Sequence, residues 1–214
     1  MHKSLEEPEL VWDMNIAGKL AVLEFWRKRG GKLVYAASST KSAATKAADG
    51  TPGKDLSPYT WGKATNVGLI ENYGRWYSLP YAVVYFYNVY GPRERAWGDY
   101  GTVVETFRQN FLAGRPHQVN APGTQTRAFT HVLDTVDGIV LAGEKGQGDG
   151  HSISSKDVHS IVEVAEMFGG PVEMHPQTKT SRSSSADDTS KIESLGWTQK
   201  RHLKDYVEEA KETK

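Results

Sequence analysis

The chain has 214 residues, no cysteine, and 26 Lys and Arg against 26 Asp and Glu, so its formal net charge is zero. The length is enough to bury a sizeable core. Zero charge argues against nucleic-acid binding as the main task, because such affinity depends on a positive surface. The lack of cysteine excludes disulfides, thiol nucleophiles and cysteine-ligated metal sites, and we expect no metal site of another kind.

Membrane insertion and secretion are also disfavoured. The longest apolar stretch, Ala82 to Tyr87, is far shorter than the roughly 20 residues of a membrane span. Glu6 and Glu7 lie where a signal peptide would have its apolar stretch. We therefore expect a soluble cytoplasmic protein with no membrane and no nucleic acid among its partners.

Helical and extended patterns alternate in the first half of the chain. The expected elements are a helix over residues 8–29, a strand over 32–37, a loop over 41–57, a helix over 59–77 and a strand over 79–90. In the first helix Ile16, Leu20 and Leu23 share one face, and Gly30 and Gly31 follow as a C-terminal stop. The last strand is rich in β-branched and aromatic residues.

The second half is less regular. Its expected elements are a helix over 101–113, a strand over 117–119, a turn at Pro122 and Gly123, a helix over 136–141, a strand over 151–153, a helix over 160–168, a loop over 177–190 and a helix over 203–211. The glycine cluster at 143–150 follows a helix and is interpreted as a turn. Strands that alternate with helices favour an α/β fold with a mainly parallel sheet.

Tyr59 and Lys63 are four residues apart on a predicted helix, so their side chains share one face. A neighbouring ammonium favours the phenolate form of a tyrosine, which can then act as a general acid or base near neutral pH. Ser38 and Ser39 follow a buried strand, at the end where open parallel sheets place catalytic groups. A surface Tyr–Lys pair beside a serine-rich turn is the alternative interpretation.

Several segments of the chain, taken together and in order, resemble the extended short-chain dehydrogenase/reductase family, in particular its NAD-dependent nucleotide-sugar epimerases and dehydratases. The segments are Asp13 to Gly18, Leu33 to Ser39, Tyr59 to Lys63, Tyr87 to Arg93, Gly123 to Asp134, and Asp188 to Lys191 with Leu195 to Trp197. The resemblance implies a Rossmann-like parallel sheet that lacks its N-terminal part, followed by a smaller C-terminal α/β substrate-binding region.

The resemblance also implies roles for individual residues. Tyr59 would be the acid/base on a sugar hydroxyl, and Lys63 would assist it and hold the nicotinamide ribose of NAD. Ser38 would orient the reacting oxygen, with Ser39 as a substrate-binding neighbour and the alternative for that role. The remaining substrate-binding candidates, which would hold the nucleotide diphosphate, are Asn88, Arg127 and Arg182. For Arg127, a solvated loop arginine is the alternative.

The sequence departs from the family pattern at its start. The family opens with a strand, a glycine-rich turn and a helix that receives the cofactor pyrophosphate. No counterpart of that turn precedes Lys32. We therefore expect weak or no NAD binding by this chain alone. A sheet without its first strands has an open edge, which predicts a homo-oligomer or a complementary N-terminal chain as a partner.

Two functions remain open from the sequence. One is an epimerase or dehydratase that acts on a nucleotide sugar by tyrosine-assisted hydride transfer. The other is a non-catalytic remnant or binding module that retains the sugar-nucleotide site. Ser39 and Thr40 stand where dehydratases carry an Asp-Glu pair, which favours an epimerase. We expect residues 1–93 to belong to the Rossmann-like catalytic domain and residues 94–214 mainly to the substrate-binding region, with some segments returning to the sheet.

Overall fold

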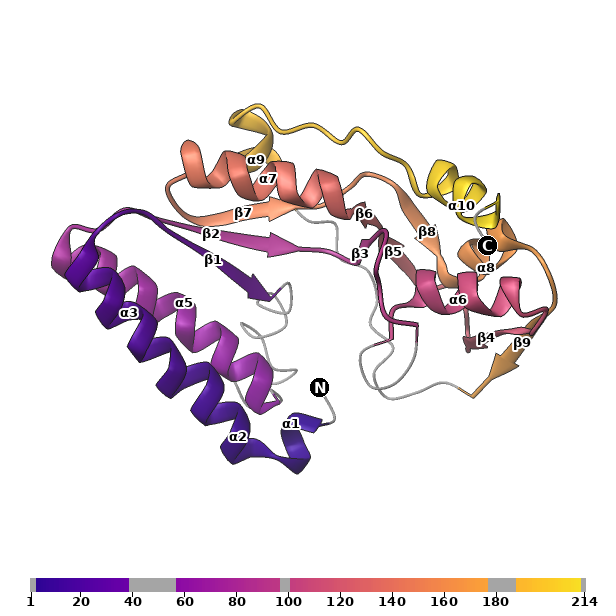
Figure 1. The fold of residues 1–214 in the computed structure, drawn as a ribbon, viewed down its shortest axis with the longest axis horizontal. Helices are drawn as coiled ribbons and strands as arrows, with labels where there is room; N and C mark the ends of the chain where they lie inside the picture. Colours follow the sequence, from indigo (N-terminus) through magenta and orange to yellow (C-terminus); the bar gives the residue numbers. More distant parts are fainter. Residues whose placement is uncertain (1–2, 39–56, 97–100, 177–187, 213–214) are drawn as a thin grey trace. The chain divides into compact units, whose positions relative to one another are not determined.

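The computed structural model describes residues 3–38, 57–96, 101–176 and 188–212 (Figure 1). Within them, helices and parallel strands form an α/β fold, as expected from the sequence. The chain divides into two compact units, each made of three chain segments. The first unit comprises 1–86, 138–152 and 190–196, and the second comprises 87–137, 153–189 and 197–214.

The first unit is built on a three-stranded sheet of order β1-β2-β7, in which β1 and β2 are parallel. Helices α3 and α5 lie together on one side of this sheet (Figure 1). The unit's elements are α1 (Lys3–Glu6), α2 (Pro8–Trp12), the π-helical turn η1 (Asp13–Ala17), α3 (Gly18–Arg29), β1 (Leu33–Ser38), α5 (Pro58–Tyr77), β2 (Tyr81–Phe86), the C-terminal half of α7 (Val132–Glu144), β7 (Gly148–Ile153) and α9 (Ser190–Ser194).

The expected helix over 8–29 is present as α2, η1 and α3, but its buried face differs from the predicted one. Leu23 is fully buried and Leu20 is 42% exposed, so the predicted stripe is wrong at Leu20. Trp26 is buried instead. The π-helical turn shifts the residues that follow it around the helix axis, because it contains one extra residue per turn. The side-chain amide of Asn66 on α5 donates to the Asn15 carbonyl oxygen within that turn, at 2.7 Å.

The strand expected over 79–90 is interrupted. β2 ends at Phe86, and β3 (Val89–Tyr90) pairs with β6 (Thr130–His131) in another sheet. Asn88 adopts a left-handed conformation with φ 38°, which an extended strand cannot contain. Strand propensity therefore marked both segments correctly, and the break at Asn88 was missed.

The second unit packs three helices against short strand pairs. Its elements are β3, α6 (Val103–Leu112), β4 (His117–Asn120), β5 (Thr126–Ala128), β6, the N-terminal half of α7, β8 (Val158–Ser160), α8 (Ile161–Phe168), β9 (Val172–His175) and α10 (Leu203–Glu212). β4 pairs with β9 in parallel, and β5 pairs with β8 in antiparallel fashion. The core of this unit is formed by Tyr90, Val104, Phe107, Val119, Phe129, Val164, Ala165, Phe168, Leu203 and Val207.

Three other expectations about elements are corrected. The helix expected over 136–141 is α7 and extends from Val132 to Glu144. The glycine cluster is only partly a turn, because β7 already begins at Gly148. The predicted loop over 177–190 lies mostly outside the described residues, and Ser190 begins α9. No helix in the described ranges is long and apolar enough to cross a membrane.

Candidate functional site

The start of α5 positions the predicted catalytic pair. Ser57 caps the helix by accepting the Thr60 backbone N–H at 3.3 Å, and Pro58 occupies the first turn, where its missing N–H costs no hydrogen bond. Tyr59 and Lys63 follow within the first two turns, both half-buried. The Ser-Pro sequence therefore determines where the helix begins. It thereby places Tyr59 and Lys63 in the first two turns.

Lys63 reaches from α5 to the sheet. Its Nζ donates to the carbonyl oxygen of Ala36 on β1 at 3.3 Å. A small pocket is lined by Lys63 and by Ser38, the last residue of β1, together with Ala37, Thr60, Ala64, Val67 and Tyr85. The structure thus brings two of the predicted catalytic residues to one pocket, and Tyr59 lies one helical turn before Lys63.

A tyrosine that sequence reasoning missed lies beside this pocket. Tyr35 on β1 is 7% exposed, with Lys19 Nζ 4.0 Å and Lys63 Nζ 5.3 Å from its ring centroid. Burial raises the pKa of Tyr35, the nearby Asn66 side chain opposes the rise, and Tyr59 is close enough to add to it. These contacts locate Tyr59 in the same region of the first unit as Lys63.

The pKa values of both lysines around Tyr35 are lowered. Burial lowers the pKa of Lys63. Burial is also the main cause of the lowered pKa of Lys19, and the charge of Lys63 contributes. Within the described part of the chain neither lysine forms an ion pair with a carboxylate. The one sequence signal for Lys19 was its position immediately after the Asp13 to Gly18 segment.

Asn88 lines a second cavity, which belongs to the second unit. This cavity has a volume of about 140 Å³ and is lined by Asn88, Val89, Glu94, Thr102, Val103, Val104 and Phe129. The Asn88 side-chain amide donates to the carbonyl oxygen of Ala128, the last residue of β5, at 3.0 Å. This hydrogen bond orients the Asn88 side chain. Arg127 lies on β5 and donates from Nη1 to the Thr126 carbonyl oxygen at 2.7 Å.

Ser39 and Arg182 lie outside the described residues. The ranges that the structure describes contain no group of three or more His, Asp or Glu side chains that could hold a metal ion. The roles of Ser38, Tyr59, Lys63, Asn88 and Arg127 remain predictions.

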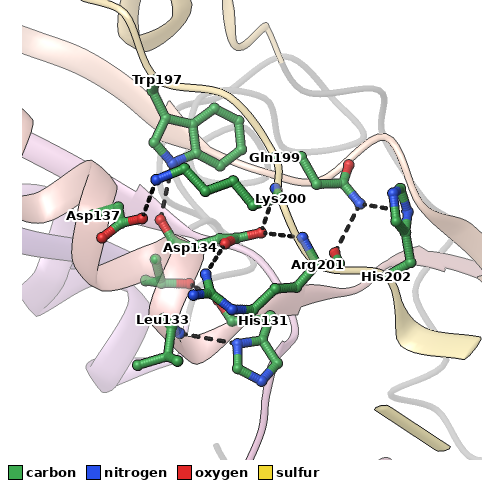
Figure 2. A network of polar contacts seen from close by, with 10 residues as sticks. His131, Leu133, Asp134, Asp137, Trp197, Gln199, Lys200, Arg201 and His202 are labelled. Carbon is green, nitrogen blue, oxygen red and sulfur yellow. Dashed lines mark hydrogen bonds and ion pairs between the residues drawn. The ribbon is translucent and has the colours of Figure 1, made fainter. Parts of the chain in front are cut away.

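Two of the segments that carried the resemblance meet in the second unit (Figure 2). The carboxylate of Asp134 is fully buried and accepts hydrogen bonds from the backbone N–H groups of Lys200, at 2.9 Å, and Arg201, at 3.0 Å. The Arg201 guanidinium pairs with the same carboxylate. Trp197 donates from its indole to the Asp134 carbonyl oxygen at 2.8 Å. Asp134 therefore anchors residues 197–201 to the start of α7.

A second anchor lies in the first unit. Lys191 Nζ donates to the carbonyl oxygen of Gln147 at 2.9 Å and to that of Asp149. Asp149 also accepts from the Tyr85 hydroxyl at 2.7 Å. Lys191 and Asp134 thus connect residues 190–201 to earlier parts of the chain. The sequence pattern alone did not indicate which residues these two side chains contact.

Comparisons with known proteins find a family model and several relatives that match this chain. Residues 1–154 match the family model described as the NAD dependent epimerase/dehydratase family. The chain is 31% identical over 208 residues to UDP-glucose 4-epimerase of Mycolicibacterium smegmatis, a match that covers 91% of this chain and 66% of that protein. It is 31% identical over 156 residues to UDP-glucuronic acid decarboxylase 5 of Arabidopsis thaliana, which covers 70% of this chain and 45% of that protein.

Solved structures of epimerases are also similar to this chain. UDP-glucose 4-epimerase of Thermotoga maritima, determined with UDP-glucose, superimposes with a TM-score of 0.86 at 26% identity, covering 99% of this chain and 72% of that one. The UDP-glucose 4-epimerase of Thermus thermophilus in complex with NAD gives 0.80 at 25% identity, covering 95% of this chain and 70% of that one. The match confirms the Rossmann-like fold, and the chain spans about 70% of each neighbour.

Proposed function

Because the chain belongs to the NAD-dependent epimerase/dehydratase family, we propose that it is built to act on a nucleotide sugar, as a UDP-sugar 4-epimerase does. The observation that carries this proposal is the approach of Lys63 to Ser38 around one pocket at the end of β1, with Tyr59 one helical turn away. The epimerase and the decarboxylase cited above are both named for UDP-linked sugars, which supports a UDP-sugar as the substrate.

Tyr59 is the acid/base in this proposal. Its phenolic oxygen takes the proton of a sugar hydroxyl, and the Ser38 hydroxyl holds the same oxygen in position. The Lys63 ammonium favours the phenolate because a positive charge nearby stabilises the negative form. The lysine is half-buried, so this interaction is weakened less by solvent than it would be on an open surface.

The residues of the first unit fit the nicotinamide-ribose end of NAD. An ammonium has three donors, and Ala36 occupies one of those of Lys63, so the others remain for a ribose hydroxyl. When bound, NAD supplies a reversible acceptor for the hydride of a sugar carbon. The pyrophosphate end has no counterpart in this sequence, because no glycine-rich turn joins a strand to a helix before Lys32.

The substrate diphosphate is assigned to the second unit. Asn88 lines its cavity, and the Arg127 guanidinium has the planar donor arrangement that suits phosphate oxygens. Ser39 and Arg182 complete the proposed set. In this proposal residues 1–93 are the C-terminal part of a catalytic domain, and residues 94–214 mainly bind the substrate.

A non-catalytic sugar-nucleotide-binding module is the second candidate. The missing pyrophosphate turn favours it for these 214 residues by themselves. The position of β1 at the edge of the described three-stranded sheet favours pairing with another strand, from a second copy or from a complementary cofactor-binding segment.

One experiment separates the candidates. The purified chain is incubated with UDP-galactose and with NAD well above about 1 mM, because weak cofactor binding is expected for this chain alone. Products are resolved by chromatography, and binding of UDP-glucose is measured by calorimetry. Turnover that falls about 100-fold to 10,000-fold in Tyr59→Phe supports the enzyme. Tyr77→Phe, an exposed tyrosine on the same helix, is the matched control and should keep full turnover. Binding without turnover supports the module, and no binding overturns both.

A further inference from the structure

Among the described residues that line the 140 Å³ cavity of the second unit, Glu94 is the acidic one. One of its carboxylate oxygens, Oε2, accepts the backbone N–H of Gly91 at 3.0 Å. Arg93, the residue before it, has a left-handed backbone with φ 72°, so the chain turns sharply between Gly91 and Glu94. The turn and the hydrogen bond together hold the carboxylate in one orientation.

The other oxygen of Glu94, Oε1, is buried, and none of the residues that the structure describes forms a hydrogen bond with it. Buried acceptors are almost always paired in proteins, so an oxygen of this kind calls for a partner that is absent from the protein itself. Burial raises the pKa of this carboxyl, and the Gly91 N–H and the nearby Thr102 hydroxyl oppose the rise only in part. The Thr102 hydroxyl itself donates to the Arg95 carbonyl oxygen, at 3.4 Å. The group is thus incompletely solvated in the free protein.

The size of the cavity indicates what kind of partner is missing. A single water requires only about 10–15 Å³, whereas a dry cavity of about 150 Å³ accommodates a six-membered ring. A carboxylate accepts hydrogen bonds and repels phosphate oxygens. The fitting ligand group is therefore a neutral ring with an N–H or O–H donor.

We infer that Glu94 is a specificity-determining residue that accepts a hydrogen bond from a ring N–H or O–H of the bound sugar nucleotide, an inference that rests on the proposed function. Two parts of such a ligand carry the required donor: the imide N–H of the pyrimidine and the hydroxyls of the hexose. Glu94 selects for the donor, while Asn88 and Arg127 hold the diphosphate, as proposed above.

Calorimetric titration of the intact chain with UDP-glucose and with UDP tests this inference. Glu94→Leu removes the acceptor at similar size and should weaken UDP-glucose binding about 10-fold or more, whereas Glu94→Gln keeps an acceptor and should lose less than about 3-fold. Glu166→Gln changes an exposed glutamate of α8 by the same charge and should bind as the wild type does. A loss shared by UDP assigns the contact to the base, and a loss confined to UDP-glucose assigns it to the hexose.

If Glu94→Leu does not fold, the donor is removed from the ligand instead, using N3-methylated and deoxy-hexose analogues. One of the two analogues should bind the wild type about 10-fold more weakly than the unmodified ligand does. The same analogue should lose less affinity for Glu94→Gln, because a neutral amide oxygen is the weaker acceptor. Unchanged affinity of Glu94→Leu, or an equal loss for every analogue with both proteins, overturns the inference while the proposed function stands. Failure of the wild type to bind UDP-glucose and UDP overturns both.

Discussion

The Lys63 side chain on α5 donates a hydrogen bond to the Ala36 carbonyl oxygen on β1, at 3.3 Å. This contact joins two segments that are separated by residues 39–56 in the sequence. It is a direct contact between the helix that carries Tyr59 and the strand that ends in Ser38. The catalytic proposal depends on the approach of these two elements.

Replacing Lys63 by methionine should lower turnover about 100-fold or more, because the proposed phenolate loses its neighbouring positive charge. Initial rates of the two proteins check this. Lys19→Met, which removes the other ammonium beside the Tyr35 ring, is the control and should keep most of the turnover. Equal losses in the two variants contradict the role of Lys63.

Asp134→Asn should destabilise the protein by about 3 kcal/mol, because the buried carboxylate then no longer balances Arg201 and an amide group faces two backbone N–H donors. Urea unfolding measures the change. Asp137→Asn removes an exposed ion pair with Lys200 and should cost at most about 1 kcal/mol. Equal effects of the two substitutions would show that the Asp134 network is not an anchor.

Stability should fall as the solution is acidified, in part because of His151. Burial, with a smaller contribution from Lys191, lowers the pKa of His151, while a hydrogen bond to the Val83 carbonyl oxygen opposes the shift. A histidine whose folded-state pKa is depressed stabilises the protein fully above its unfolded pKa of about 6.5 and loses that contribution as the pH falls through the folded value. Urea midpoints between about pH 7 and pH 5 should therefore decrease, and less steeply in His151→Gln.

NAD should bind this chain alone more weakly than about 1 mM, because these residues lack the turn that places a helix N-terminus at the pyrophosphate. Calorimetric titration of the purified chain with NAD checks this. Saturable binding in the micromolar range would falsify it.

The chain should associate with a partner through the unpaired side of β1. In the described sheet this strand has a neighbour only on its β2 side, and Ala36 at its centre is exposed. Size-exclusion chromatography with light scattering should show an oligomer. Otherwise the chain should become stable only after a complementary segment is added. A stable, monodisperse monomer at all concentrations would contradict this expectation.

Local sequence determined much of the fold. Ser57 and Pro58 mark the start of α5, Gly30 ends α3 with a φ of 69°, and the β-branched residues of β2 predict a buried strand. Each of these signals acts over a few residues, through capping, backbone freedom or side-chain shape. The Tyr59–Lys63 spacing belongs to the same class, since it follows from helix geometry alone.

Only the tertiary structure decided which distant residues meet. The approach of Lys19 to Tyr35, the burial of Asp134 against Arg201, and the unpaired oxygen of Glu94 in its cavity are not visible in any short segment. Neither was the exposure of Leu20, since the π-helical turn before it is linked to Asn66, far along the chain. Periodicity and spacing report how a segment folds on itself, whereas burial and pairing depend on what the rest of the chain packs against it.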